Sequence, residues 1–168
     1  MGRTKIESFS DLFVHELKDL YSAESQLIEA LPKMAKAASS QKLVDAYKSH
    51  FEETKKQKER LERIAEMLGV DVKGETCEAM KGLIKEGEDV IEAKAPDNLK
   101  DAALIAAAQR VEHYEMAGYG TAVYFADMLQ EHEVSDLLAE TLDEEKAADS
   151  KLNKIAMESI NQQAAKHD

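Results

Sequence analysis

The sequence predicts an all-α protein, a four-helix bundle of two antiparallel helical hairpins with a short fifth helix in the long crossover between them. Composition is the first observation: of 168 residues 43% are hydrophobic and 33% are charged, with only 7 glycines and 2 prolines. These values fit a single folded domain over residues 1–168. The second observation is that no segment alternates apolar and polar residues as a half-buried strand does. Apolar residues instead recur every three or four positions over long stretches, which is typical of amphipathic helices.

Five helices follow from this periodicity and from the breaks in it. We expect them at residues 8–38, 42–68, 76–92, 98–128 and 134–160, with turn-forming residues between them at 39–40, 69–74, 95–98 and 130–133. Pro32 lies inside the first helix and is expected to bend it or to begin its last two turns. The short connections make the first and second helices, and the fourth and fifth, antiparallel neighbours. The polar end of the chain after Asn161 is expected to fray.

Each long helix carries an inward-facing apolar stripe that is interrupted near its middle by polar residues. These are Glu24 on the first helix, His50, Thr54 and Gln57 on the second, Glu112 and Glu115 on the fourth, and Thr141 and Glu145 on the fifth. Glu53 and Asp149 lie beside the stripes of their helices. Counting outward from the two hairpin turns places all these residues at about the same height in the bundle.

Carboxylates gathered at one buried level need a strong compensating interaction. An isolated ionised carboxylate loses solvation worth tens of kcal/mol in an idealised low-dielectric interior, so proteins pair it or protonate it. No lysine or arginine occupies the middle positions of the stripes, whereas two divalent cations would offset about four negative charges. Carboxylate and imidazole ligands suit iron and manganese, so the pattern predicts a buried metal site.

Five sequence stretches resemble the YciF-like bacterial stress proteins, within the ferritin-like di-iron superfamily that includes rubrerythrin. They are YSAE at 21–24, HFEETKKQ at 50–57, CEAMKGLI at 77–84, DAALIAAAQRVEHYE at 101–115 and EEKAAD at 144–149. The resemblance implies a ferritin-like fold, a cytoplasmic homodimer and an association with stress. It also implies iron, one or two ions, with manganese as the alternative. The metal ligands that it implies are Glu24, Glu112, Glu115 and Glu145, followed by Glu53 and Asp149.

The sequence departs from the di-iron pattern in its histidines. Di-iron bundles usually carry Glu-x-x-His on two helices. Here the residue three positions after Glu53 is Lys56, and the residue three positions after Glu145 is Ala148. Fewer strong ligands leave open a single ion or two unequal sites. Gln57, level with Glu24, offers only a neutral oxygen. His50 and His113 are expected to compensate, as ligands or as hydrogen-bond partners of the ligands, and Tyr119 can hydrogen-bond a ligand or relay an electron.

Each of these residues can instead have a purely structural role. A carboxylate on a stripe can be a core residue hydrogen-bonded to a tyrosine, threonine or histidine. Glu53 and Asp149, off the stripes, can be solvated ion-pair partners, and His50 and Tyr119 can be packed core residues.

Charge and composition narrow the partners and the functions. The formal charge of −12 argues against nucleic acid and anionic membranes as partners, and no apolar run approaches the roughly 20 residues of a membrane span. A single cysteine, Cys77, and an N-terminus without an apolar signal segment favour the cytoplasm.

The leading hypothesis is a metal-binding protein that oxidises Fe(II) or reduces dioxygen or peroxide with an external electron donor. The alternatives are a non-enzymatic stress or structural dimer with a vestigial site, and mineral storage, which would require a cage.

Overall fold

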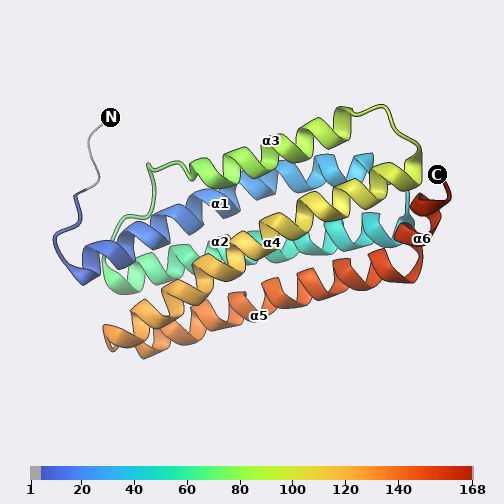
Figure 1. Cartoon of the computed structure of the whole chain (residues 1–168). Coiled ribbons are helices and arrows are strands. Elements are labelled where there is room, and N and C mark those ends of the chain that lie inside the picture. The colour runs from blue at the N-terminus through green and yellow to red at the C-terminus, as the bar shows by residue number, and fades with distance from the viewer. Residues whose placement is uncertain (1–4, 168) are drawn as a thin grey trace.

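The structure, a computed structural model, describes residues 5–167, and in that range it is a helical bundle without strands (Figure 1). Its four long helices are α1 (Phe9–Ala37), α2 (Gln41–Leu68), α4 (Asp97–Met128) and α5 (His132–Ile155), and the short α3 (Glu78–Glu92) lies in the crossover. α1 packs against α2 and α4 against α5, while contacts of α2 with α5 and of α1 with α4 join the two hairpins. The predicted fold class and helix order are therefore confirmed, and apart from the end of α5 the helix ends lie within two residues of the prediction.

α1 begins at a capping box and runs without interruption. The Asp11 amide donates to the Ser8 hydroxyl at 3.0 Å, and the Ser8 amide donates to the Asp11 carboxylate at 2.9 Å. The helix continues through Pro32 to Ala37, so the proline does not end it. The 29 residues of α1 thus carry Glu24 near the middle of the bundle.

The turn between α1 and α2 is held by a carboxylate from the other hairpin. Asp101, buried on α4, accepts hydrogen bonds from the Ser39 amide at 2.9 Å and the Ser40 amide at 2.7 Å. These amides precede the first turn of α2, where helix N–H groups lack partners within the helix and a negative charge is favourable. Asp101 therefore ties the first hairpin to the second at one end of the bundle.

The first segment of the crossover, between α2 and α3, begins at Gly69 and ends at Cys77. Gly69 has a φ of 65°, a left-handed conformation that suits glycine, and it closes α2. The Cys77 sulfur accepts from the Met80 amide at 3.4 Å and starts α3. α3 lies along α1 and α4, which leaves the side formed by α2 and α5 uncovered by it (Figure 1).

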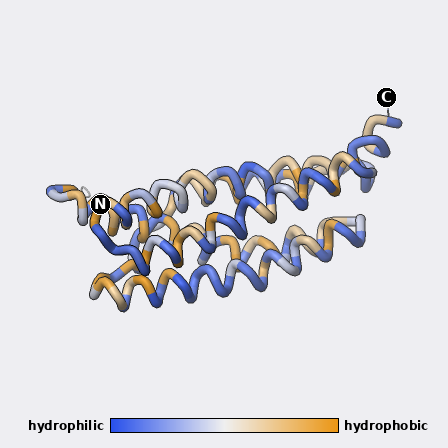
Figure 2. Tube along the Cα trace, turned by 90° about the horizontal axis from the view of Figure 1, so that it is seen from below, coloured by the Kyte–Doolittle hydropathy of each residue, from blue (hydrophilic) through white to orange (hydrophobic). Residues whose placement is uncertain are grey.

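The core is divided into two apolar clusters by a polar layer. The first apolar cluster includes Phe13, Leu17, Leu20, Leu61, Ile64, Tyr119 and Leu138. The second includes Leu27, Leu31, Leu43, Tyr47, Leu104, Ile105, Leu152 and Ile155. Between them lies the polar layer, made of Glu24, His50, Thr54, Gln57, Glu112, Glu115, Thr141 and Glu145, all buried. Figure 2 shows hydrophobic and hydrophilic segments alternating along the helices, and among residues 5–167 no helix combines the length and apolar character of a membrane span.

The C-terminal end differs from the sequence prediction. The α-helix ends at Ile155 rather than at residue 160, and a π-helical turn (Ala156–Ile160) follows. The chain does not fray after Asn161 but continues as α6 (Asn161–Ala164) and a 3₁₀ turn (Ala165–His167). The reason is that this segment packs on α4 with Ile160 and Ala164 buried, and Asn98 donates to the Gln163 carbonyl at 2.7 Å.

Replacing Asp101 tests the tie between the hairpins. We expect Asp101→Ala to lower the free energy of unfolding by about 1.5–3 kcal/mol, because two amides lose a charged acceptor. Urea denaturation followed by circular dichroism measures the change. Asp136→Ala, at an exposed position of α5, is the matched control and should change stability by less than about 0.5 kcal/mol. Equal stabilities for the two variants would contradict the assigned role.

Candidate metal centre

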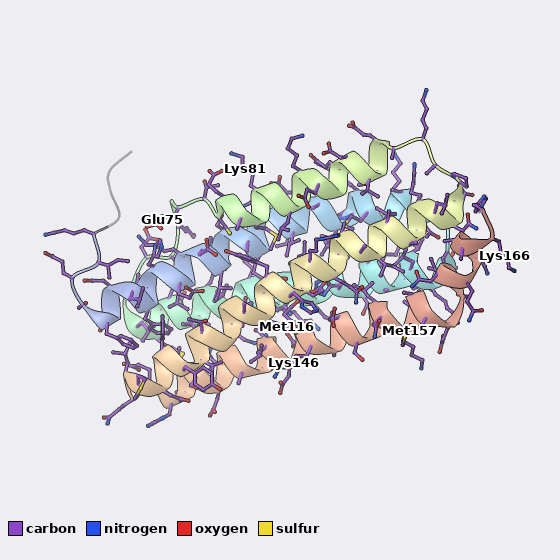
Figure 3. The ribbon with its side chains drawn as sticks, viewed as in Figure 1. Glu75, Lys81, Met116, Lys146, Met157 and Lys166 are labelled. Atoms are coloured by element: carbon purple, nitrogen blue, oxygen red, sulfur yellow. The ribbon has the colours of Figure 1, made fainter. Side chains whose placement is uncertain are left out.

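Four buried side chains from three helices converge in the polar layer. His50 comes from α2, Glu112 and Glu115 from α4, and Glu145 from α5, and each offers one ligand atom within 4.8 Å of the others. Their exposed fractions are 5%, 2%, 0% and 0%. Figure 3 labels Met116 and Lys146, the residues directly after Glu115 and Glu145, at the same height along the bundle. The arrangement is therefore a compact set of one imidazole and three carboxylates.

The helix register explains why these side chains meet. Glu112 and Glu115 are three residues apart on α4, so both face the same side of that helix. Glu145 occupies the facing position of the antiparallel α5, and His50 approaches from α2. The His50 Nε2 atom lies 3.3 Å from Glu112 Oε1 and 3.8 Å from Glu145 Oε2.

Glu24 completes the polar layer from α1. It is fully buried, and its Oε1 accepts a hydrogen bond from the Tyr119 hydroxyl. Its other oxygen, Oε2, has no hydrogen-bond partner. Tyr119 therefore fixes one oxygen of Glu24 and leaves the other free to bind a cation.

The polar layer holds a group of buried atoms without hydrogen-bond partners. Within residues 5–167 these are Oε2 of Glu24, the Tyr47 hydroxyl, Nε2 of His50, Oγ1 of Thr54, Oε1 of Gln57, Oε2 of Glu112, both oxygens of Glu115 and Oε2 of Glu145. Buried polar groups are normally paired, and each unpaired one costs about 1–3 kcal/mol, more when charged. Six of these nine atoms are carboxylate or amide oxygens, which only accept while unprotonated and then cannot satisfy one another. A divalent cation would satisfy several of them at once, so the residues fit a metal.

Protonation of the metal-free cluster follows from burial and from neighbouring charges. Burial raises the pKa of Glu24 to about 8, against the opposing effect of the Tyr119 hydrogen bond. Burial, then the adjacent carboxylates, also raise the pKa of Glu115 and of Glu145 well above the usual range.

His50 and Glu112 form an ion pair in the metal-free cluster. Burial alone would lower the pKa of His50, but Glu112, with Glu53 and Glu145, outweighs it and raises that pKa. Burial alone would raise the pKa of Glu112, but His50 outweighs it and lowers that pKa. The metal-free layer is thus balanced by protons and by one ion pair, and a bound cation would take the place of those protons.

Gln57 and Arg60, two residues of α2 outside the four-residue cluster, form hydrogen bonds with Glu145 or with the adjacent Glu144. The Gln57 amide donates to Glu145 Oε1 and, at 3.0 Å, to Glu144 Oε2. Arg60 in turn donates to both carboxylate oxygens of Glu144, at 3.0 and 3.1 Å. Gln57 thus lies in the polar layer, where its stripe position predicts it, whereas Arg60 and Glu144 lie off the stripes and were not predicted. The only signal for Arg60 was its position one turn after Gln57.

The structure places the remaining predicted residues outside the cluster. The Glu53 side chain is 41% exposed; it lies 3.5 Å from the outer nitrogen of His50, Nδ1, and accepts from the Ser49 hydroxyl at 3.4 Å. Asp149 is not a member of the four-residue cluster and pairs with Gln109 at 3.1 Å and with His113 at 3.3 Å. His113 is itself exposed. Their assignment as ligands stays a prediction, and as placed they are partners at the edge of the polar layer.

Comparisons with known proteins agree on one family. The family described as "Domain of unknown function (DUF892)" matches residues 8–165. Protein YciF of Escherichia coli (strain K12) is 46% identical over 160 residues, 95% of this chain and 96% of YciF. The crystal structure of the E. coli stress protein YciF matches with a TM-score of 0.90 over 93% of this chain and 99% of that one. YcfI from Rhodopseudomonas palustris, 42% identical, matches with a TM-score of 0.87 over 91% of this chain and 98% of that one.

The stability of the metal-free protein should decrease between pH 5 and pH 8. In that range folded Glu24, Glu115 and Glu145 retain protons that the unfolded chain, with ordinary glutamate pKa values, has released. Stability falls with pH wherever the folded state binds more protons, by up to about 1.4 kcal/mol per pH unit for each retained proton. Denaturation in the presence of a chelator measures the slope. The Glu24→Gln variant should show a shallower slope, and a stability that rises with pH over this range would contradict these protonation states.

Proposed function

Because the chain belongs to the DUF892 family of YciF-like proteins, we propose that it is a stress-associated, ferritin-like protein that binds one or two iron or manganese ions. The stress association rests on the E. coli relative, which is described as a stress protein. The observation that carries the metal assignment is the set of unpartnered buried atoms centred on Glu115, whose two oxygens both lack partners. A bound cation would satisfy several of these unpaired acceptors at one level.

The donor set favours iron or manganese over other ions. Three carboxylates and one imidazole provide hard oxygen donors with a single nitrogen, and no thiolate lies among them. Such sets suit Fe and Mn, whereas thiolate-rich sets select Zn and Cu(I). His50, Glu112, Glu115 and Glu145 would hold one ion, and Glu24, with its free oxygen, offers a carboxylate toward a second.

The residues around the cluster would keep the ligands in place. Tyr119 holds Glu24, Gln57 holds Glu145, and Arg60 neutralises Glu144 beside it. The two apolar clusters exclude water from above and below the layer. When bound, iron would supply one-electron redox chemistry toward dioxygen or peroxide. The chain has a single cysteine and thus no cysteine quartet for an iron electron-transfer site, so turnover would require an external electron donor.

A non-enzymatic structural role is the second candidate, and Gln57 favours it. A Gln57 amide that donates to Glu145 uses one ligand oxygen for a hydrogen bond, which weakens the site for metal.

A homodimer is proposed under either function. Its support is that α4 exposes two large apolar side chains one turn apart, Tyr124 at 73% and Met128 at 72%.

Metal content distinguishes the two candidates. We expect protein purified without chelator to hold at least one iron or manganese ion per chain, measured by inductively coupled plasma mass spectrometry. Glu112→Ala and Glu145→Ala should lower metal affinity by at least about tenfold, since losing even a hydrogen-bond partner of a ligand costs that much. Glu133→Gln, exposed on α5, is the matched control and should retain wild-type metal. If the wild type holds no more metal than the two alanine variants and these remain folded by circular dichroism, the structural role is the correct one.

Redox activity needs a separate measurement. Protein loaded with Fe(II) without oxygen and then exposed to air or peroxide should develop ferric absorbance faster than Fe(II) in buffer. Glu115→Gln should slow this oxidation, because it replaces a carboxylate that has no other partner. Metal binding without any ferric absorbance would restrict the function to binding.

A further inference from the structure

A cavity of about 160 Å³ connects the polar layer with the surface between α2 and α5. Its inner lining includes His50 and Glu112, both buried and both carrying an atom without a hydrogen-bond partner. Its outer lining includes Ser49, Glu53 and Lys151, which reach the surface. The cavity opens on the side of the bundle that α3 leaves uncovered (Figure 1).

Small residues keep the cavity open. Ala46 on α2 and Ala147 and Ala148 on α5 form part of its wall. Ala148 lies one turn after Glu145, so a larger side chain there would fill space beside His50. By contrast, an apolar cavity between α1, α3 and α4 is only about 20 Å³ and includes none of the four clustered residues in its lining.

The polar groups along the cavity form a continuous series from the surface to the cluster. Glu53, partly exposed, lies 3.5 Å from His50 Nδ1, and the opposite nitrogen of His50 lies 3.3 Å from Glu112 and 3.8 Å from Glu145. The lining holds three carboxylates, Glu53, Glu112 and Glu144, against two cationic groups, the ammonium of Lys151 and the imidazolium of His50 in its ion pair with Glu112. The charge balance and the oxygen donors favour a cation over an anion.

We propose that this cavity is the passage through which a divalent cation reaches the buried cluster, with Glu53 as the carboxylate that captures it at the mouth. The inference rests on the proposed metal-binding function and adds the route to it. In this role Glu53 increases the rate at which the cation enters the cluster and is not a ligand of the bound ion. Ala148 keeps the passage wide enough for the ion.

The rate of cobalt binding tests the route. Co(II) added to chelator-treated protein in a stopped-flow instrument reports binding directly through its visible absorbance. We expect Ala148→Leu to slow binding at least tenfold and Glu53→Gln to slow it severalfold, with the final absorbance of both equal to that of the wild type. Ala106→Leu, the same change at an exposed position of α4 outside the cavity lining, is the control and should bind at the wild-type rate.

Each other outcome overturns a defined part of the proposal. A wild-type rate in Ala148→Leu would show that ions arrive by another route. A lower final absorbance in Glu53→Gln would make Glu53 a ligand. If the wild type binds no cobalt, iron or manganese, the metal function itself fails and the route with it. Should Ala148→Leu fail to fold by circular dichroism, Ala147→Leu at the exposed part of the same wall replaces it, and an unchanged rate there would refute the passage.

Discussion

Four carboxylates share one buried level of this bundle, and the need to balance their charge shapes everything around them. In water each would be solvated, but here α1, α4 and α5 hold Glu24, Glu112, Glu115 and Glu145 away from solvent. Protons and the His50–Glu112 pair can balance the charge in the metal-free chain, but they leave several oxygens without a partner. A cation balances the charge and satisfies the oxygens together. If the proposed metal binds, the centre would gain affinity toward it at the expense of stability without metal.

The rest of the fold keeps this layer at one height. Two long antiparallel hairpins bring mid-helix residues together, and Asp101 ties the end of the first hairpin to the second. α3 closes the groove between α1 and α4, so the side between α2 and α5 remains for access to the centre. The hydrogen bonds of Gln57, Arg60 and Glu144 run between these same two helices. They hold Glu145 in the polar layer and Glu144 in the lining of the cavity.

The sequence could predict the helices and most of the polar layer because both depend on local periodicity. Glu24, Glu112, Glu115 and Glu145 lie where the apolar stripes and the hairpin turns place them. Glu53 and Asp149 were harder to place, because a residue beside the stripe can face inward or outward with a small rotation of its helix. The partners of Arg60 could not be predicted from the sequence, because α2 and α5 belong to different hairpins. The relative shift of these hairpins depends on the whole crossover. The π-helical turn after Ile155 likewise depends on packing against α4.

Because the polar layer divides the core, substitutions in one apolar cluster have different packing neighbours from substitutions in the other. Phe13 and Leu138 pack in one apolar cluster, Leu43 and Ile155 in the other, and the two clusters share no residue. Substitutions at opposite ends of the bundle therefore have separate packing neighbours, and their effects on stability should add. Either end can be repacked during evolution without disturbing the other. The polar layer has no such freedom, because four of its side chains converge from three different helices.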